Sequence, residues 1–323
     1  TDNVYIGSGA GYYLDDGAFN VIIGKEAGKS SSGTGKATQY NVFIGHKAAY
    51  VTTDTVRSIV IGNEAGYSMT IGSESVIIGD QAGYDLTTTT KTVLIGRAAG
   101  ADINSTDANG TIAIGYNTGR SITSGQKNTI IGYNAGDAMT TSDSNTIIGY
   151  EAGTSVITSG EQGSTLIGKE AGKALTTGAY NTAIGRGALK TATTAAACIA
   201  IGDQAMQYTP AGVNVTSVIA IGMAALNDAS NLSTNANNSI AIGLGAGTNA
   251  TGLAGEFVLV GAYAGQKMGG TGITHIGYNA GQYASGSQNT FVGSKAGRGG
   301  TTSAPFSTGT NNVAVGYESL KGF

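Results

Sequence analysis

A nine-residue stretch, Asn-Thr-Ile-Ile-Gly-Tyr-Asn-Ala-Gly at 128–136, recurs with variations along the whole chain, and its next copy at 145–153 begins 17 residues later. Its central glycine, which we call the marker glycine, is present in eighteen copies. The interval between markers is most often 17 residues, lengthens in places to 18–23 and shortens twice to 16. A short fixed period with occasional insertions indicates a repeat protein in which each copy forms one turn of a coil and loops accommodate the extra residues. The marker glycines are Gly7, Gly24, Gly45, Gly62, Gly79, Gly96, Gly115, Gly132, Gly149, Gly168, Gly185, Gly202, Gly222, Gly243, Gly261, Gly277, Gly293 and Gly316.

The repeat predicts an all-β fold, a parallel β-solenoid of about 18 rungs of 17 residues, with 1–323 as a single elongated repeat domain. Solenoid repeats contact mainly their neighbours, so a chain of 323 residues needs no second globular core. The first and last rungs lie directly at the two ends of the sequence. We therefore expect the chain to be a fragment or a processed part of a longer protein.

The three residues that directly precede each marker glycine are predicted to form a short strand. The residue directly before the marker is Ile in fifteen copies and Val in three, and the residue two positions earlier is always β-branched. Side chains two apart in a strand share a face. We predict that this face is the interior of the coil, where stacked Ile and Val form ladders along its axis. The predicted interior ladder comprises Ile23, Ile44, Ile61, Ile78, Ile95, Ile114, Ile131, Ile148, Ile167 and Ile184.

The central residue of each strand points the other way and is also mostly apolar. A strand that is apolar on both faces is buried on both faces, and an exposed apolar stripe in a soluble protein marks an interface. We therefore predict that this stripe is a subunit interface; the alternative is a two-layer solenoid whose second strand covers the stripe within one chain. The predicted interface comprises Tyr5, Ile22, Phe43, Leu94, Ile130, Ile147, Leu166 and Phe291.

The residues after the marker glycine predict a tight turn. Two variable, often polar residues are followed by Ala in sixteen copies and then by Gly in thirteen. So small a residue indicates an inward corner, and the glycine indicates a positive φ. Where Leu189, Met206, Leu226 or Leu320 replaces that glycine, we expect a different turn geometry. The rest of the rung, rich in Thr, Ser and Gly, predicts a short second strand and a return turn.

Asn recurs four residues before the marker glycine, with Ser or Thr in several other copies. An Asn at a solenoid corner can hydrogen-bond its own backbone and that of the next rung. Cys198 occupies this position in its rung, so we expect a structural role for it rather than a reactive thiol. As the single cysteine it can form neither a disulfide framework nor a thiolate metal site.

Composition and charge narrow the function classes. The net charge of −3 predicts no attraction to nucleic acid or to an anionic membrane, and no apolar run approaches the roughly 20 residues of a membrane span. Gly is abundant, at 54 residues, but does not fall at every third position as in collagen. The many β-branched residues argue against disorder.

The sequence offers little chemistry, and we predict that the protein is not an enzyme and binds no cofactor. The glycine-rich runs 7–11 and 243–247 lead into no helix and no Lys-Ser/Thr pair, as a phosphate loop would require. His46 and His275 have no partnered nucleophile; because His275 replaces a residue of the predicted interface, a packed or pH-sensitive interface histidine is favoured. Asp15-Asp16 lacks the alternating pattern of calcium-binding β-rolls, although calcium bound in a loop stays an alternative.

Two further alternatives concern carbohydrate and ice. Glycoside hydrolysis needs two carboxylates about 5–10 Å apart, and the scattered acids nominate no pair. Flat threonine arrays are typical of ice-binding solenoids, so the many threonines make ice binding an alternative. However, no Thr-x-Thr recurs in register from rung to rung. Loops that break the period are better placed for recognition. The loop at 299–310, with Pro305 and Phe306, is our candidate recognition loop; an ordinary tolerated surface loop is the alternative.

The repeat Asn-Thr-Ile-Ile-Gly-Tyr-Asn-Ala-Gly, followed by Thr-Thr-Gly or Thr-Ser-Gly, resembles the repeats of bacteriophage tail fibres and tailspikes. It is similar also to the left-handed β-roll heads of trimeric autotransporter adhesins, whose Asn-Ser-Val-Ala-Ile-Gly rungs are shorter and are approached most nearly at 238–243. The resemblance covers the whole chain. It implies a homotrimeric, parallel β-solenoid shaft.

We accordingly expect a structural and adhesive shaft of a phage or virus fibre, which presents a host-receptor-binding tip. Its partners would be further copies of itself, other fibre or tail proteins and a host surface glycan or protein receptor, with no nucleic acid and no membrane insertion. Its location would be extracellular, on the virion surface. A bacterial cell-surface trimeric adhesin is the second interpretation, and a glycan-hydrolysing tailspike or an ice-binding solenoid is the third.

Overall fold

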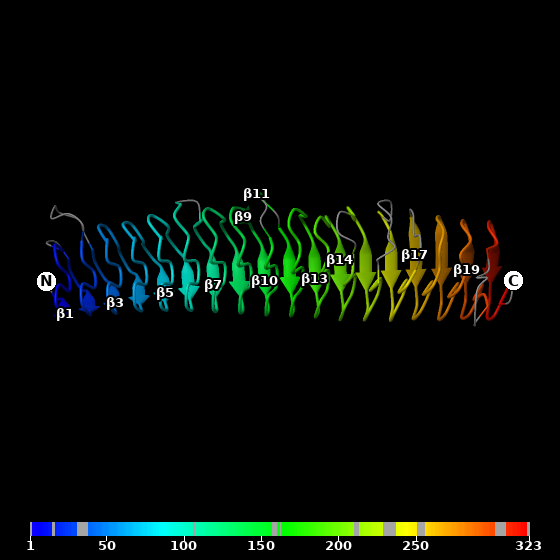
Figure 1. Cartoon of the computed structure of the whole chain (residues 1–323), viewed down its shortest axis with the longest axis horizontal. Helices are drawn as coiled ribbons and strands as arrows, with labels where there is room; N and C mark the ends of the chain where they lie inside the picture. The colour runs from blue at the N-terminus through cyan, green and yellow to red at the C-terminus, as the bar shows by residue number, and fades with distance from the viewer. Residues whose placement is uncertain are drawn as a thin grey trace. The chain divides into compact units, whose positions relative to one another are not determined.

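The computed structural model describes residues 2–14, 17–30, 38–105, 108–156, 160–161, 163–209, 213–228, 237–250, 256–300 and 308–321. Its contacts divide the chain into two compact units, Thr1–Gly163 (unit 1) and Ser164–Phe323 (unit 2), and each is described by itself. In both, short parallel strands lie side by side, one per rung, as the arrows of Figure 1 show. Each unit is a parallel β-solenoid, and no α-helix occurs in the described residues. The predicted fold class is confirmed.

The strands of unit 1 that form the main sheet are β1 (Val4–Ile6), β2 (Val21–Ile23), β3 (Val42–Ile44), β4 (Ile59–Ile61), β5 (Val76–Ile78), β6 (Val93–Ile95), β7 (Ile112–Ile114), β8 (Thr129–Ile131) and β10 (Thr146–Ile148). Those of unit 2 are β12 (Thr165–Ile167), β13 (Thr182–Ile184), β14 (Ile199–Ile201), β15 (Ile219–Ile221), β16 (Ile240–Ile242), β17 (Phe257–Val260), β18 (Ile273–Ile276), β19 (Thr290–Val292) and β20 (Val313–Val315).

Each strand pairs with the next rung in strict register, so equivalent residues stack directly on one another. Val21 faces Val42, and Val42 faces Ile59, although 21 residues separate the first pair and 17 the second. The backbone bonds also run from rung to rung: the Gly24 amide donates to the Ile6 carbonyl at 2.8 Å. A loop can therefore lengthen without displacing the ladders.

The predicted second strand is formed only in places. β9 (Ser142–Asp143) pairs with β11 (Gly160–Glu161) in unit 1, and elsewhere in the described residues the same part of the rung makes isolated bridges, such as Ala196 with Thr216. The rest of each rung is held by turns and by hydrogen bonds to the neighbouring rung.

The interior of the coil is lined by the central residue of each strand, and our prediction of the interior face was wrong. Ile22, Phe43 and Leu94 are fully buried, whereas the isoleucines directly before the marker glycines point outward and are half-buried. Successive side chains of a strand alternate between faces, so only one set can line the coil. The outward residues, predicted as the interior ladder, are Ile23, Ile44, Ile61, Ile78, Ile95, Ile114, Ile131, Ile148, Ile167 and Ile184.

The predicted subunit interface is therefore the core of the coil. Ile22, Phe43, Leu94, Ile130, Ile147, Leu166 and Phe291 are fully buried within the chain, and Tyr5 in the first rung is partly exposed. This agrees with the alternative that one chain covers the stripe, although turns cover it and not a complete second strand layer. The alanine three residues after the marker faces the same interior and is fully buried in copies such as Ala65 and Ala135, which confirms the predicted corner. We call the central strand residues the core column.

A second set of interior side chains comes from the residue seven positions after the marker glycine, which the sequence analysis did not single out. Met69, Leu86, Ile103, Ile122 and Met139 are all fully buried there. They pack in the part of the rung that we expected to be a polar second strand. Together with the core column and the alanine corner, they fill the coil.

The marker glycine is required because successive rungs approach closely at this point. Gly62 has a φ of +143°, and a Cβ on it would lie 2.3 Å from the carbonyl oxygen of Gly79 in the next rung. No side chain fits at that distance. The same contact recurs between marker glycines along both units.

The fourth residue after the marker has a positive φ in every type of rung, so the expectation of another turn geometry for the leucine and methionine copies was wrong. Leu189 has a φ of +53°, close to the +54° of Gly66. What differs is the core column: a Cβ on Gly172 would lie 2.9 Å from Leu166 Cδ2, whereas the rung of Leu189 has Ala183 instead. Leu189, Met206 and Leu226 are buried and occupy the space that Ala183, Ala200 and Ala220 leave. The two positions share one interior volume.

The Asn position forms the predicted ladder along the corner. In unit 1, the Asn41 side chain accepts a hydrogen bond from the Ser58 amide at 2.8 Å and donates one to the Thr55 carbonyl at 2.7 Å. Both partners lie in the next rung, which confirms this prediction. In unit 2, the Asn181 oxygen accepts from the Cys198 amide at 3.0 Å, and Cys198 is buried. Burial raises the pKa of the Cys198 thiol, as suits a structural residue.

The shared volume predicts a compensating pair. Leu166→Ala should destabilise unit 2 by about 2–5 kcal/mol through a cavity, and Gly172→Leu by about 1–3 kcal/mol through overpacking. The double variant reproduces the Ala183 and Leu189 pair of the next rung, so it should recover most of the loss, with a coupling free energy of about 2 kcal/mol. Denaturant unfolding measures all four free energies. Simple additivity would contradict the shared volume.

The positive φ predicts opposite effects of one substitution at adjacent alanines. Ala224 has a φ of +55°, and Ala225, which follows it, is buried and lies outside the positive-φ set. Ala224→Gly should stabilise unit 2 by about 0.5–1 kcal/mol because glycine adopts this conformation without steric cost. Ala225→Gly should destabilise it by about 1 kcal/mol. Thermal or denaturant unfolding measures both changes in the free energy of unfolding. Changes of the same sign for the two variants would contradict the proposed strain at Ala224.

Candidate interaction surface

The residues one and three positions before each marker glycine, on either side of the core-column residue, form an apolar stripe on the outside of each unit, which we call the outer stripe. These residues are Val, Ile or Thr and stack in register, as Val76 on Val93 and Ile78 on Ile95. They are only half-buried, and Ile59, Ile242 and Ile276 are 37–40% exposed. A regular, two-residue-wide apolar surface of this kind marks a place where another molecule packs.

The residue after the marker glycine lines one edge of the outer stripe, and in unit 1 this column is joined from rung to rung. His46 Nδ1 lies 3.0 Å from Asn63 Oδ1, and the Asn63 amide donates to Asp80 at 2.8 Å. Asp80 in turn lies 3.4 Å from the Arg97 guanidinium. These exposed contacts fix the direction of long side chains, but each adds at most about 1 kcal/mol.

The same column continues with tyrosines. The Arg97 guanidinium donates to the Tyr116 hydroxyl at 2.9 Å, and the Tyr116 and Tyr133 rings stack at 5.1 Å. Tyr133 stacks on Tyr150 at 5.4 Å. Because each ring face is covered by the next ring, the tyrosines present edges and hydroxyls to solvent. In unit 2 the column is less regular, with a bidentate Arg186–Asp203 pair at 2.7 and 2.8 Å.

The other edge of the outer stripe is lined by the residue five positions before the marker glycine. Phe19 and Tyr40 stack there at 5.0 Å, and Arg57 lies 3.6 Å from Glu74. The outer stripe is therefore apolar in the middle and polar or aromatic at both edges. A desolvated centre with a polar rim is the pattern of protein–protein interfaces.

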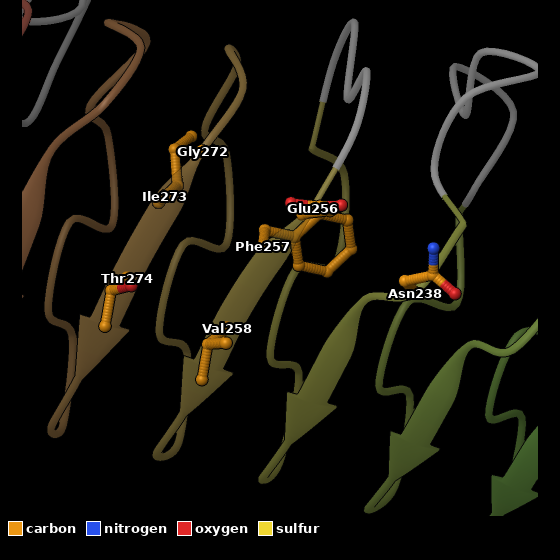
Figure 2. Close-up of a pocket in the computed structure, with 7 residues that line it drawn as sticks. All are labelled: Asn238, Glu256, Phe257, Val258, Gly272, Ile273 and Thr274. Atoms are coloured by element: carbon orange, nitrogen blue, oxygen red, sulfur yellow. The ribbon is translucent and has the colours of Figure 1, made fainter.

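A shallow hollow of about 260 Å³ lies at the start of β17 and β18 in unit 2. Figure 2 shows Asn238, Glu256 and Gly272 at this end of three neighbouring rungs, with Val258 and Thr274 farther along the strands. Gly272 has no side chain to fill the space between its neighbours. Glu256 is the only carboxylate among the described residues that line the hollow, so these residues do not supply the pair that glycoside hydrolysis uses.

The two histidines have different surroundings. His46 is exposed in the edge column of unit 1, and His275 is fully buried in the core column of unit 2. The prediction of an interface histidine was therefore wrong for His275, because the stripe it belongs to faces inward. Asp15, Asp16, Pro305 and Phe306 lie outside the described residues. The candidate recognition loop and the loop-calcium alternative stay predictions.

Within the described residues, no group of three or more His, Cys, Asp or Glu side chains is placed to hold a metal ion. The same part of the chain holds no helix of the length and apolarity that a membrane span requires. No protein-family model matches the chain, and no curated protein or solved structure matches it either.

Proposed function

We propose that the chain is a structural protein, the repeat shaft of a homotrimeric phage or virus fibre that holds a receptor-binding part away from the particle. The observation that carries this proposal is the outer stripe, which repeats on every rung and is left half-exposed by its own chain. The resemblance of the repeat motif to fibre repeats supports a fibre shaft and an assembly of three chains. The stripe supports the self-association that such a shaft needs.

A further copy of the chain is the partner that fits the outer stripe best. A partner that covers the stripe along a unit must present apolar groups at the same spacing as the rungs, and a second copy does so by construction. The stripe itself carries no charged residue, so copies can pack without burying unpaired charge. The edge columns offer polar groups for the rim, as in the Asn63–Asp80–Arg97 series.

The trimer is tested by native mass, with shape from small-angle X-ray scattering. The wild-type chain of 32.1 kDa should give a native mass of about three chains. A monomer at micromolar concentration would contradict the proposed assembly. An adhesin of a bacterial cell surface would assemble in the same way, and binding of the trimer to phage tail components, rather than to cells alone, would favour the fibre.

A matched pair of variants separates assembly from folding. Ile131→Asp places a charge on the outer stripe of unit 1, so it should abolish the trimer while the circular dichroism spectrum stays that of a β-solenoid. Ile130→Asp, one residue earlier, buries an unpaired charge in the core column, and should lower the free energy of unfolding by several kcal/mol. An Ile131→Asp variant that stays trimeric, or an Ile130→Asp variant with an unchanged melting transition, would overturn this assignment of faces.

A further inference from the structure

The core column of unit 2 contains one titratable side chain, an imidazole. The other strands of this unit place Leu166, Ala183, Leu259, Phe291 or a further alanine at that position, and β18 places His275 there. Its side chain is fully buried. An apolar residue would fill the same space without a polar group, so the histidine adds a property that packing does not require.

Apolar groups and backbone surround the ring. Leu259 and Phe291 are its neighbours in the register of β17 and β19, and the Phe291 ring stacks on the imidazole at 4.8 Å with an angle of 13° between the planes. Gly281 also packs against the ring, and a Cβ on it would lie 2.0 Å from His275 Cε1. The packing leaves no room for the ring to turn outward while the rung stays closed.

Neither ring nitrogen of His275 has a hydrogen-bond partner among the described residues. A neutral imidazole carries one donor and one acceptor, and a protonated one carries two donors and a charge. Burial without partners disfavours the charged form strongly. The imidazole is therefore held neutral by the closed coil.

In the described part of these rungs, no charged group faces the ring from the elements packed against it. The charged and titratable residues are exposed or half-buried on the outside, where Lys295 pairs with Glu318 at 3.1 Å and Arg298 Nε donates to Gln282 at 3.0 Å. Burial alone lowers the pKa of His275 from 6.5 to about 3. The other charged and titratable groups of these rungs are Glu256, Tyr263, Lys267, Tyr278 and Tyr283.

We propose that His275 is an acid-sensitive point of unit 2, at which protonation opens the rungs of β17, β18 and β19. Above pH 6.5 the imidazole is neutral in the open and closed forms, and the closed form keeps its full stability. As the pH falls from 6.5 towards 3, only the open form binds the proton, so closure loses stability across this window. This inference does not depend on the proposed fibre function.

Hydrogen exchange of the full chain, followed by mass spectrometry at pH 7.5 and pH 4.5, tests the proposal. After correction for the intrinsic exchange rate, amides of β17–β19 should lose protection by about 100-fold at pH 4.5, two pH units below the open-state pKa. Amides of β2–β6 in unit 1 should not show this loss. His46→Gln removes the other histidine and should leave the response unchanged.

His275→Phe is the matched variant, because Phe291 holds the equivalent place one rung later, where a Cβ on Gly297 would lie 2.3 Å from its ring. His275→Leu is a second variant, which repeats the residue that Leu259 places in the preceding rung. Either folded variant should lose the acid response of β17–β19. An equal loss of protection in these variants, or full protection of the wild-type rungs at pH 4.5, would overturn the proposal.

Discussion

The structure depends on the backbone hydrogen bonds that amides of the strands and marker glycines make to carbonyls of a neighbouring rung. The Gly45 amide donates to the Ile23 carbonyl and the Gly62 amide to the Ile44 carbonyl. A rung between two others is therefore hydrogen-bonded to the rung on each side of it. This arrangement brings the backbones so close that only glycine fits at the marker position. The side chains then have to stack in columns of like residues, because the rungs are in register.

Much of this fold could be predicted from the sequence. The period indicated the rungs, the three-residue strands and the Asn ladder, because each of these depends on local residue type at a fixed spacing. The orientation of the strands could not be predicted from alternation, since both faces are apolar: Val21, Ile22 and Ile23 are all candidates for a core. The signal that decides it lies elsewhere in the rung. Ala183 is accompanied by Leu189, and Leu166 by Gly172, which is the compensation that two side chains in one volume would show, although Ala113 and Ala241 are accompanied by Gly119 and Gly247.

The candidate surface was recognised as a feature but assigned to the wrong residues. An apolar stripe that the chain does not cover does exist, on the residues first expected inside. The edge column from His46 to Tyr150 could not be predicted either. Its residues are His, Asn, Asp, Arg and Tyr, which differ in charge and shape and so form no recognisable sequence pattern. They share only the ability to reach a neighbour one rung away, 17 or 19 residues along the chain, which becomes visible when the rungs are stacked. The buried state of His275 follows from the same correction of faces.

The tolerance of the register to loop length has a consequence for how such a chain can change in size. Since Val42 pairs with Val21 across 21 residues as well as with Ile59 across 17, a rung is recognised by its three-residue strand and its marker glycine and not by its total length. Copies as alike as 128–136 and 145–153 are therefore interchangeable parts. Unequal recombination between them would add or delete whole turns without breaking a single column, so the reach of the molecule can evolve independently of its stability per turn.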